Sequence, residues 1–200
     1  MIVTAIEQTA KNKYRIYIEE EFAFVLYKGE LSRFHIHEGG EISESVYKEI
    51  RTEVILKRAK KKAMYLLNIS DRTERELQEK LEREEFPDWA VQQAVSYVKS
   101  FGYINDERYI ENFIRSKKEK ESRKSIYAKL CRKGLDGEKI QALMELYFEE
   151  TTENETISNL LRKKGFCRDT ADAKEKQKMV AYLARKGFSY SAIRESVGWE

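Results

Sequence analysis

Residues that commonly carry out chemistry are sparse in this chain of 200 residues. His35 and His37 are its only histidines, and they alternate with Phe34 and Ile36, so a strand would place both on one face. Two imidazoles can begin a metal site, but no third ligand accompanies them. Because the chain has no other histidine, the side chain that most often acts as a general base is absent from the rest of the sequence. We therefore expect neither a metal site nor a catalytic histidine.

Cysteines and carboxylates do not form a recognisable site either. Cys131 and Cys167 belong to no C-x-x-C pair, which argues against a disulfide framework or a zinc site. Carboxylates around Glu79 alternate with basic residues, and Glu79 and Arg83 have the i, i+4 spacing of a solvated helix surface. The sequence contains no glycine-rich phosphate loop and no nucleophile elbow. We predict that the protein is not an enzyme and uses no cofactor.

The composition indicates a folded but highly charged protein. Apolar residues make up 41% and charged residues 36%, and the 12 Tyr and 9 Phe exceed what disordered chains contain. One proline and nine glycines favour helices with brief stops over a β-sandwich. The sequence has no apolar run of about 20 residues, as a membrane span needs, and no signal pattern. With two thiols suited to a reducing compartment, we expect a cytoplasmic protein.

Basic residues gather in clusters. Residues 1–50 hold six Lys/Arg and nine Asp/Glu, a balance of −3, and residues 51–200 hold 32 and 26, a balance of +6. Such clusters attract polyanions or an acidic protein groove, although a solvated helix face explains any single cluster equally well. The candidate residues for binding a partner or DNA are Lys57, Arg58, Lys60, Lys61, Lys62, Arg115, Lys117, Lys118, Arg123, Lys124, Lys129, Arg132, Lys133, Arg162, Lys163, Lys164, Arg185 and Lys186.

The first forty residues predict a small antiparallel β meander. Apolar residues recur at every second position, as in half-buried strands: Ile16, Ile18, Phe22, Phe24 and Leu26. Polar stretches predict turns at residues 11–13, 19–21 and 28–29. Gly39–Gly40 is expected to end the meander, and Ser43 to cap the first helix.

The rest of the chain has a helical apolar period and an internal repeat. In each copy, apolar residues occupy positions i, i+4, i+9 and i+14 around a helix stop. The three sets are Leu77, Leu81, Phe86 and Val91; Ile126, Leu130, Leu135 and Ile140; and Met179, Leu183, Phe188 and Ile193. A repeat near fifty residues indicates stacked supersecondary units. Gly134 and Gly187 stand where a left-handed residue can end a helix.

These patterns predict a mainly α-helical fold, in which a small antiparallel β meander precedes a tandem array of three three-helix units. We expect the array to be elongated and curved. The predicted segments are a β-rich region at 1–42, a connecting helix at 43–58, and helical units at 59–104, 105–152 and 153–200. A globular bundle with accidental internal similarity is the alternative.

A basic helix at residues 123–133 is the best candidate contact surface. Ile126 and Leu130 mark its apolar side, and Lys129 and Arg132 project from the opposite side. The basic pair Arg185–Lys186 recurs at the corresponding place in the third unit. A positive stripe along the array would match a repeating, negatively charged partner.

Three stretches resemble the RecX family of RecA regulators. They are the segment Ala63–Leu81, the segment FGYINDERY at residues 101–109, and the segment LCRKGL at residues 130–135. The β-rich front and the tandem units also resemble the longer members of that family. One departure is that members often carry a glycine where Glu121–Ser122 stands here, which leaves the local turn open.

The resemblance implies a non-enzymatic modulator of recombination and DNA repair. Its partners would be the RecA recombinase and the RecA–DNA filament, where it would impede ATP hydrolysis and strand exchange and favour disassembly. We expect a monomer whose direct binding to single- or double-stranded DNA is weak and salt-sensitive. A basic protein binding DNA directly is the alternative. Only Gln92 and Gln93 offer base readout in the third helices, so that binding would have little sequence specificity.

Overall fold

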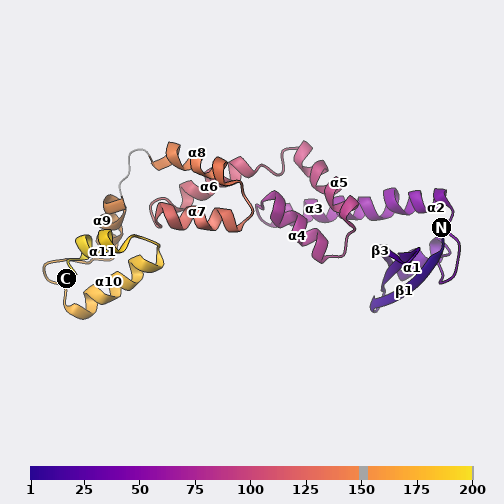
Figure 1. The fold of residues 1–200 in the computed structure, drawn as a ribbon, viewed down its shortest axis with the longest axis horizontal. Coiled ribbons are helices and arrows are strands. Elements are labelled where there is room, and N and C mark those ends of the chain that lie inside the picture. Colours follow the sequence, from indigo (N-terminus) through magenta and orange to yellow (C-terminus); the bar gives the residue numbers. More distant parts are fainter. Residues whose placement is uncertain (149–152, 200) are drawn as a thin grey trace. The chain divides into compact units, whose positions relative to one another are not determined.

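The computed structural model describes residues 1–148 and 153–199. The chain divides into two compact units, residues 1–105 and 106–200. The first unit contains the only sheet in the described part and one set of three helices, and the second contains two further sets of three helices (Figure 1). The predicted combination of a β meander and three tandem three-helix units is confirmed.

The sheet has the order β1–β2–β3 and is antiparallel throughout, with β1 at Val3–Ala10, β2 at Lys13–Ile18 and β3 at Glu21–Tyr27. Ile16, Phe24 and Leu26 are fully buried, as their period of two predicted. Phe22 differs, because the register shifts between Ile16 and Tyr17 of β2 and leaves Phe22 39% exposed against the ring of Tyr17. A β-bulge of this kind changes the face of every residue beyond it.

The segment after β3 is helical, which corrects two expectations. Residues 28–29 do not form a turn but begin α1 (Lys28–Arg33), because the Glu30 carboxylate accepts the backbone N–H of Tyr27 at 2.7 Å. His35 and His37 therefore do not lie on a strand: His35 has a left-handed φ of 52° after α1, and the His37 ring packs against Gly40.

One continuous helical stretch links the sheet to the first repeat. Ser43 caps it as expected, accepting the N–H of Val46 at 3.3 Å. The stretch consists of α2 (Glu44–Glu49), a π-helical segment η1 (Ile50–Leu56) and α3 (Lys57–Ile69). Helices α4 (Glu74–Arg83) and α5 (Asp88–Ser100) pack onto it and complete the first repeat. Their buried residues belong to the same apolar cluster as the inner face of the sheet.

The second unit holds two separate apolar clusters, one for each repeat. The second repeat consists of α6 (Asp106–Lys117), α7 (Arg123–Arg132) and α8 (Gly137–Phe148), and the third of α9 (Glu153–Lys163), α10 (Ala173–Arg185) and α11 (Tyr190–Val197). The repeated apolar positions form the cores: Ile126, Leu130, Leu135 and Ile140 in the second repeat, and Leu183, Phe188 and Ile193 in the third, with Met179 partly buried.

The stop after the middle helix of each repeat is a left-handed residue. Gly134 and Gly187 have φ values of 79° and 83°, as expected. The same position in the first repeat is held by Glu85, with a φ of 66°. A residue with a side chain is disfavoured there, so Glu85 must gain compensating contacts. Its carboxylate pairs with Lys13 and Arg15 of β2, which joins the first repeat to the sheet.

Candidate functional site

The basic run at the start of α3 is partly used to hold the first unit together. Arg58 donates to the Val25 carbonyl at 3.1 Å and pairs with Glu30. Lys62 pairs with Glu84 at 2.7 Å. These contacts fix α3 to β3 and α4. Arg58 and Lys62 are therefore structural residues in addition to being basic.

The remaining members of this run are more available. Lys57 pairs with Glu53 one turn earlier, and the side chains of both are more than half exposed. Lys60 and Lys61 make no ion pair within the described residues. Exposed i, i+4 pairs contribute little to stability and are readily exchanged for an outside anion. The accessible positive charge of this run is therefore mainly that of Lys57, Lys60 and Lys61.

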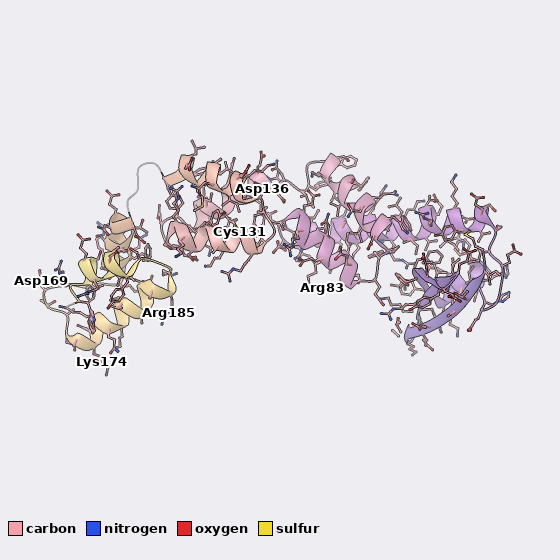
Figure 2. All side chains as sticks on the ribbon, in the orientation of Figure 1. Arg83, Cys131, Asp136, Asp169, Lys174 and Arg185 are labelled. Carbon is pink, nitrogen blue, oxygen red and sulfur yellow. The ribbon has the colours of Figure 1, made fainter. Side chains whose placement is uncertain are left out.

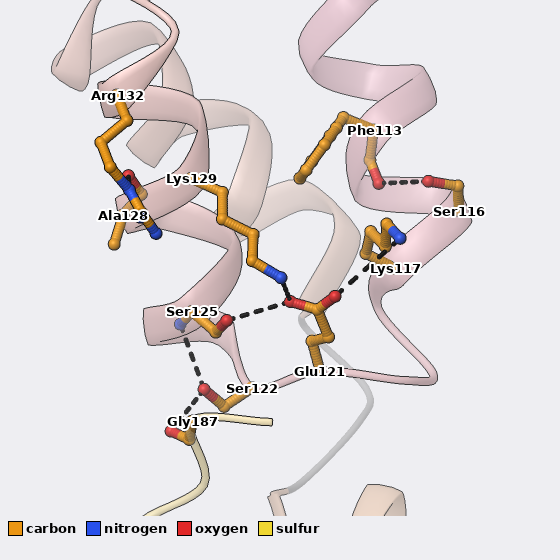
Figure 3. A network of polar contacts seen from close by, with 10 residues as sticks. All are labelled: Phe113, Ser116, Lys117, Glu121, Ser122, Ser125, Ala128, Lys129, Arg132 and Gly187. Carbon is orange, nitrogen blue, oxygen red and sulfur yellow. Dashed lines mark hydrogen bonds and ion pairs between the residues drawn. The ribbon is translucent and has the colours of Figure 1, made fainter. Parts of the chain in front are cut away.

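A buried carboxylate organises the basic segment of the second repeat (Figure 3). The side chain of Glu121 is 7% exposed and accepts the Ser125 hydroxyl at 3.0 Å. It also pairs with Lys129 and lies 3.9 Å from the Lys117 ammonium. Burial alone would raise the pKa of Glu121, but the hydrogen bonds from Lys129 and Ser125 and the nearby lysine charges outweigh it and lower this pKa.

Ser122 forms the turn that sequence analysis left open. It caps α7, its Oγ accepting the N–H of Ser125 at 3.1 Å. Its hydroxyl also donates to the Gly187 carbonyl at 2.6 Å, and its N–H donates to the Lys186 carbonyl at 3.0 Å. The Glu121–Ser122 turn thus connects the second and third repeats through hydrogen bonds. Sequence analysis missed this role, although a serine directly before a basic helix is a usual capping signal.

Lys129, which spacing placed on the side of α7 opposite the apolar residues, does not offer a free charge. Its ammonium group is engaged by Glu121, and the exposed basic face of α7 is instead formed by Lys124 and Arg132, which flank Ala128. Arg123 lies 4.0 Å from Glu145 of α8. Within the described residues, neither Lys124 nor Arg132 forms an ion pair. Of the two residues that spacing placed on this side, Arg132 therefore remains accessible and Lys129 is engaged.

Some of the other basic candidates contact a neighbouring polar or aromatic side chain, and others are exposed. Arg115 donates to the Tyr147 hydroxyl at 2.7 Å, and Lys163 lies 3.8 Å from Glu119. Lys133 lies over the ring of Tyr109, and Lys164 and Lys186 lie over the ring of Tyr182, at 5.3 to 5.7 Å. Arg185 projects from the last turn of α10 (Figure 2). Arg162 and Arg185 are exposed, and Lys118 is partly exposed.

A cavity with a volume of about 800 Å³ lies within the second unit. Its walls include Glu121 and Tyr127 of the second repeat and Thr156, Phe188 and Tyr190 of the third. Glu121 is held ionised by its lysine partners, so it is an acceptor and not a proton donor at neutral pH.

Within the described residues, no three His, Cys, Asp or Glu side chains are grouped so as to hold a metal ion. In residues 1–148 and 153–199, no helix combines the length and the apolar character that crossing a membrane requires. What the described surface does offer chemically is exposed cationic side chains and, in the second unit, an open cavity.

The sequence matches three family models, one for each repeat. They describe the first, second and third three-helix domains of RecX and match residues 59–97, 105–144 and 152–197. The regulatory protein RecX of Caldanaerobacter subterraneus subsp. tengcongensis is 31% identical over 98% of either chain. That of Clostridioides difficile is 30% identical over 96% of this chain and 92% of the other.

Solved structures share the fold. A crystal structure of regulatory protein RecX covers 100% of this chain and 99% of its own, with a TM-score of 0.56 and 23% identity. A crystal structure of RecX from Lactobacillus salivarius covers 72% of this chain and 94% of its own, with a TM-score of 0.53 and 21% identity. The family models, the relatives and the repeated helical units agree along nearly the whole length. The chain belongs to the RecX family of regulatory proteins.

Proposed function

We propose that this protein is a non-enzymatic, cytoplasmic regulator of the RecA recombinase that acts on the RecA–DNA filament. The observation that carries this proposal is the match of all three repeats to the RecX domains, in order and without a missing unit. The action would be to lower ATP hydrolysis and strand exchange and to favour filament disassembly. A chain with several helical units can make several weak contacts on one polymer, which together give avidity.

The decisive experiment measures RecA ATP hydrolysis on single-stranded DNA while this protein is added in substoichiometric steps. A regulator of the filament should inhibit well below one copy per RecA, because one bound molecule affects a polymer and not a single subunit. Absence of inhibition, with filament assembly confirmed by electron microscopy and the added protein confirmed folded by circular dichroism, would contradict the proposal.

The exposed charge on α7 gives a sharper test of which surface acts. Lys124→Gln with Arg132→Gln should raise the concentration needed for half inhibition by about fivefold or more, because two exposed cations are lost from a polyanion-facing surface. Unlike a change at Lys129, these changes leave the buried Glu121 cluster intact.

The matched control is Lys174→Gln with Lys178→Gln. These residues are exposed on α10, and their loss changes the net charge equally. Equal effects of the two double variants would show that only total charge matters, and would remove α7 as the contact surface.

We also propose weak, salt-sensitive binding of DNA through the exposed lysines and arginines. Lys61, Lys124 and Arg185 are exposed and make no ion pair within the described residues. Each phosphate contact should add to the salt dependence of the binding constant. Titration of labelled DNA at increasing salt, with and without RecA, separates this activity from the action on the filament.

A further inference from the structure

Three aromatic side chains at the end of the first unit are exposed and touch one another. Tyr97, Phe101 and Tyr103 are 36%, 61% and 50% exposed. The ring centroids of Tyr97 and Phe101 are 5.0 Å apart, and those of Phe101 and Tyr103 are 6.1 Å apart. Single exposed aromatics are ordinary, but a contiguous row indicates a contact surface. We call these three residues the aromatic ledge.

The backbone holds the ledge in a fixed geometry. Gly102 lies between the two most exposed rings and has a left-handed φ of 69°. Its N–H donates to the Lys99 carbonyl at 2.9 Å, and the N–H of Tyr103 donates to the Val98 carbonyl at 3.1 Å. This pair of bonds is a Schellman motif, which closes the end of α5. The backbone that carries Phe101 and Tyr103 is therefore preorganised and loses little freedom when a ligand binds.

Cationic side chains from α3 border the ledge. The Lys60 ammonium lies 4.5 Å from the centroid of the Tyr97 ring, a cation–π distance that joins the two helices. Lys61 is exposed next to Lys60, and Lys57 lies one turn before it on α3. Lys99 is engaged by Glu74 at 2.7 Å and adds little charge. The surface at this end of the first unit thus has a positive part, formed by the lysines of α3, and an apolar part, formed by the rings of the ledge.

We propose that the aromatic ledge, with Lys57, Lys60 and Lys61, is a docking surface for single-stranded nucleic acid. Exposed bases would stack on Phe101 and Tyr103, and the phosphates would pair with the lysines. Proteins that bind single strands without sequence preference combine these two features. A duplex does not fit equally well, because its bases already stack on each other. A partner protein would also bury aromatic rings, but it would not need a row of lysines alongside.

The first arm of the test compares binding of two labelled strands of about 15 nucleotides, one of oligo(dT) and one of abasic residues with the same phosphates. Fluorescence anisotropy of the full-length protein gives both affinities. Phe101→Ala with Tyr103→Ala should weaken oligo(dT) binding about tenfold or more, since each stacked base contributes substantially. Binding of the abasic strand should change less than about twofold, because the lysines remain.

Tyr190→Ala is the matched control. Tyr190 is 61% exposed and has the Arg194 guanidinium at 5.9 Å from the centroid of its ring, so it presents the same chemistry. It belongs to α11 of the third repeat and is not part of the proposed surface. The control should bind both strands as the wild type does.

Several results would overturn the proposal. One is unchanged oligo(dT) binding by the folded double variant, and another is an equal loss of both strands. Loss of inhibition of RecA with unchanged oligo(dT) binding would assign the ledge to a protein partner instead. Phe101→Trp gives an independent readout, because its fluorescence should be quenched by oligo(dT) and not by the abasic strand. The RecA assay is separate, so failure here leaves the proposed function standing.

Discussion

Two acidic residues stabilise this protein through ion pairs that each of their side chains makes with two basic residues. Glu121 is buried in a basic segment, and Glu85 stands in a left-handed turn. Each binds two basic side chains: Glu121 binds Lys117 and Lys129 nearby in the sequence, and Glu85 binds Lys13 and Arg15 of β2. In a sequence with 36% charged residues, neither can be told apart from the many solvated carboxylates. The partners of Glu85 depend on packing between distant segments, and those of Glu121 on the turn before α7, so sequence analysis found neither set.

The ionisation of Glu121 should stabilise the second unit. Its folded pKa is lowered, so this stabilisation is complete above the unfolded pKa of about 4.3 and disappears as pH falls through the folded pKa. Glu121→Gln should lower the free energy of unfolding by about 2 kcal/mol at pH 7, because charged hydrogen bonds to Lys129 and Ser125 are weakened.

Urea unfolding at pH 7 and at acidic pH, for the wild type and the variant, measures this effect. The difference between the two proteins should shrink toward zero as the pH falls below the folded pKa. A difference that does not depend on pH would show that the charge of Glu121 has no part in it.

The left-handed turn at Glu85 gives a second test at the residue scale. Glu85→Gln keeps the strained backbone but loses the ionic contacts with Lys13 and Arg15, and Glu85→Gly loses the contacts but relieves the strain. The glutamine variant should therefore be less stable than the glycine variant, by about 1 kcal/mol. Thermal unfolding of both proteins measures the order, and the reverse order would show that Glu85 is not strained.

At the scale of elements, apolar periodicity predicted most of the helices because each repeat must bury the same positions. Leu81, Leu130 and Leu183 are all fully buried, as the repeat required. What periodicity did not predict is where regular pairing is interrupted. Phe22 is displaced by a bulge at Ala23 of β3, and α1 replaces a turn because of a cap formed by Glu30. Both depend on local hydrogen bonds that leave no periodic trace.

Where the second and third repeats meet, the backbone at Gly187 lies close to the side chains of Ser122 and Ser125. A Cβ added to Gly187 would lie 2.7 Å from the Ser125 Cβ and 2.8 Å from the Ser122 Oγ. Gly187→Ala should therefore destabilise the second unit by about 2 to 4 kcal/mol, through backbone strain and crowding together.

Gly165→Ala separates the two causes. Gly165 has a similar φ of 67°, but nothing lies within 4 Å of an added Cβ, so only strain remains. Its cost should be about 1 to 2 kcal/mol. Chemical unfolding monitored by circular dichroism compares the two, and equal costs would mean that the contact with Ser122 and Ser125 yields without penalty.

At the scale of the whole molecule, the chain consists of two units that each enclose their own apolar residues. The sheet and the first repeat share one cluster, and the second unit has a cluster for each of its two repeats. The sequence predicted the order of units but not that the sheet and the first repeat are one body, because that depends on contacts such as Arg58 with β3.

This division predicts that fragments 1–105 and 106–200 fold separately. Fragment 1–105 should unfold in one cooperative transition, because its sheet and helices share a core. Circular dichroism and amide hydrogen exchange of each fragment, compared with the full chain, measure this. A fragment 1–105 that stays unfolded alone would show that it depends on the second unit.

The exception at Glu85 also limits how this architecture can be extended by design. The second repeat ends its middle helix with Gly134, which needs no outside partner, so it is a suitable template for inserting further copies. A duplicated first repeat would carry a copy of Glu85 with no second Lys13 or Arg15 to neutralise it. The first repeat is thus fitted to the sheet beside it and is a poor building block for a longer chain.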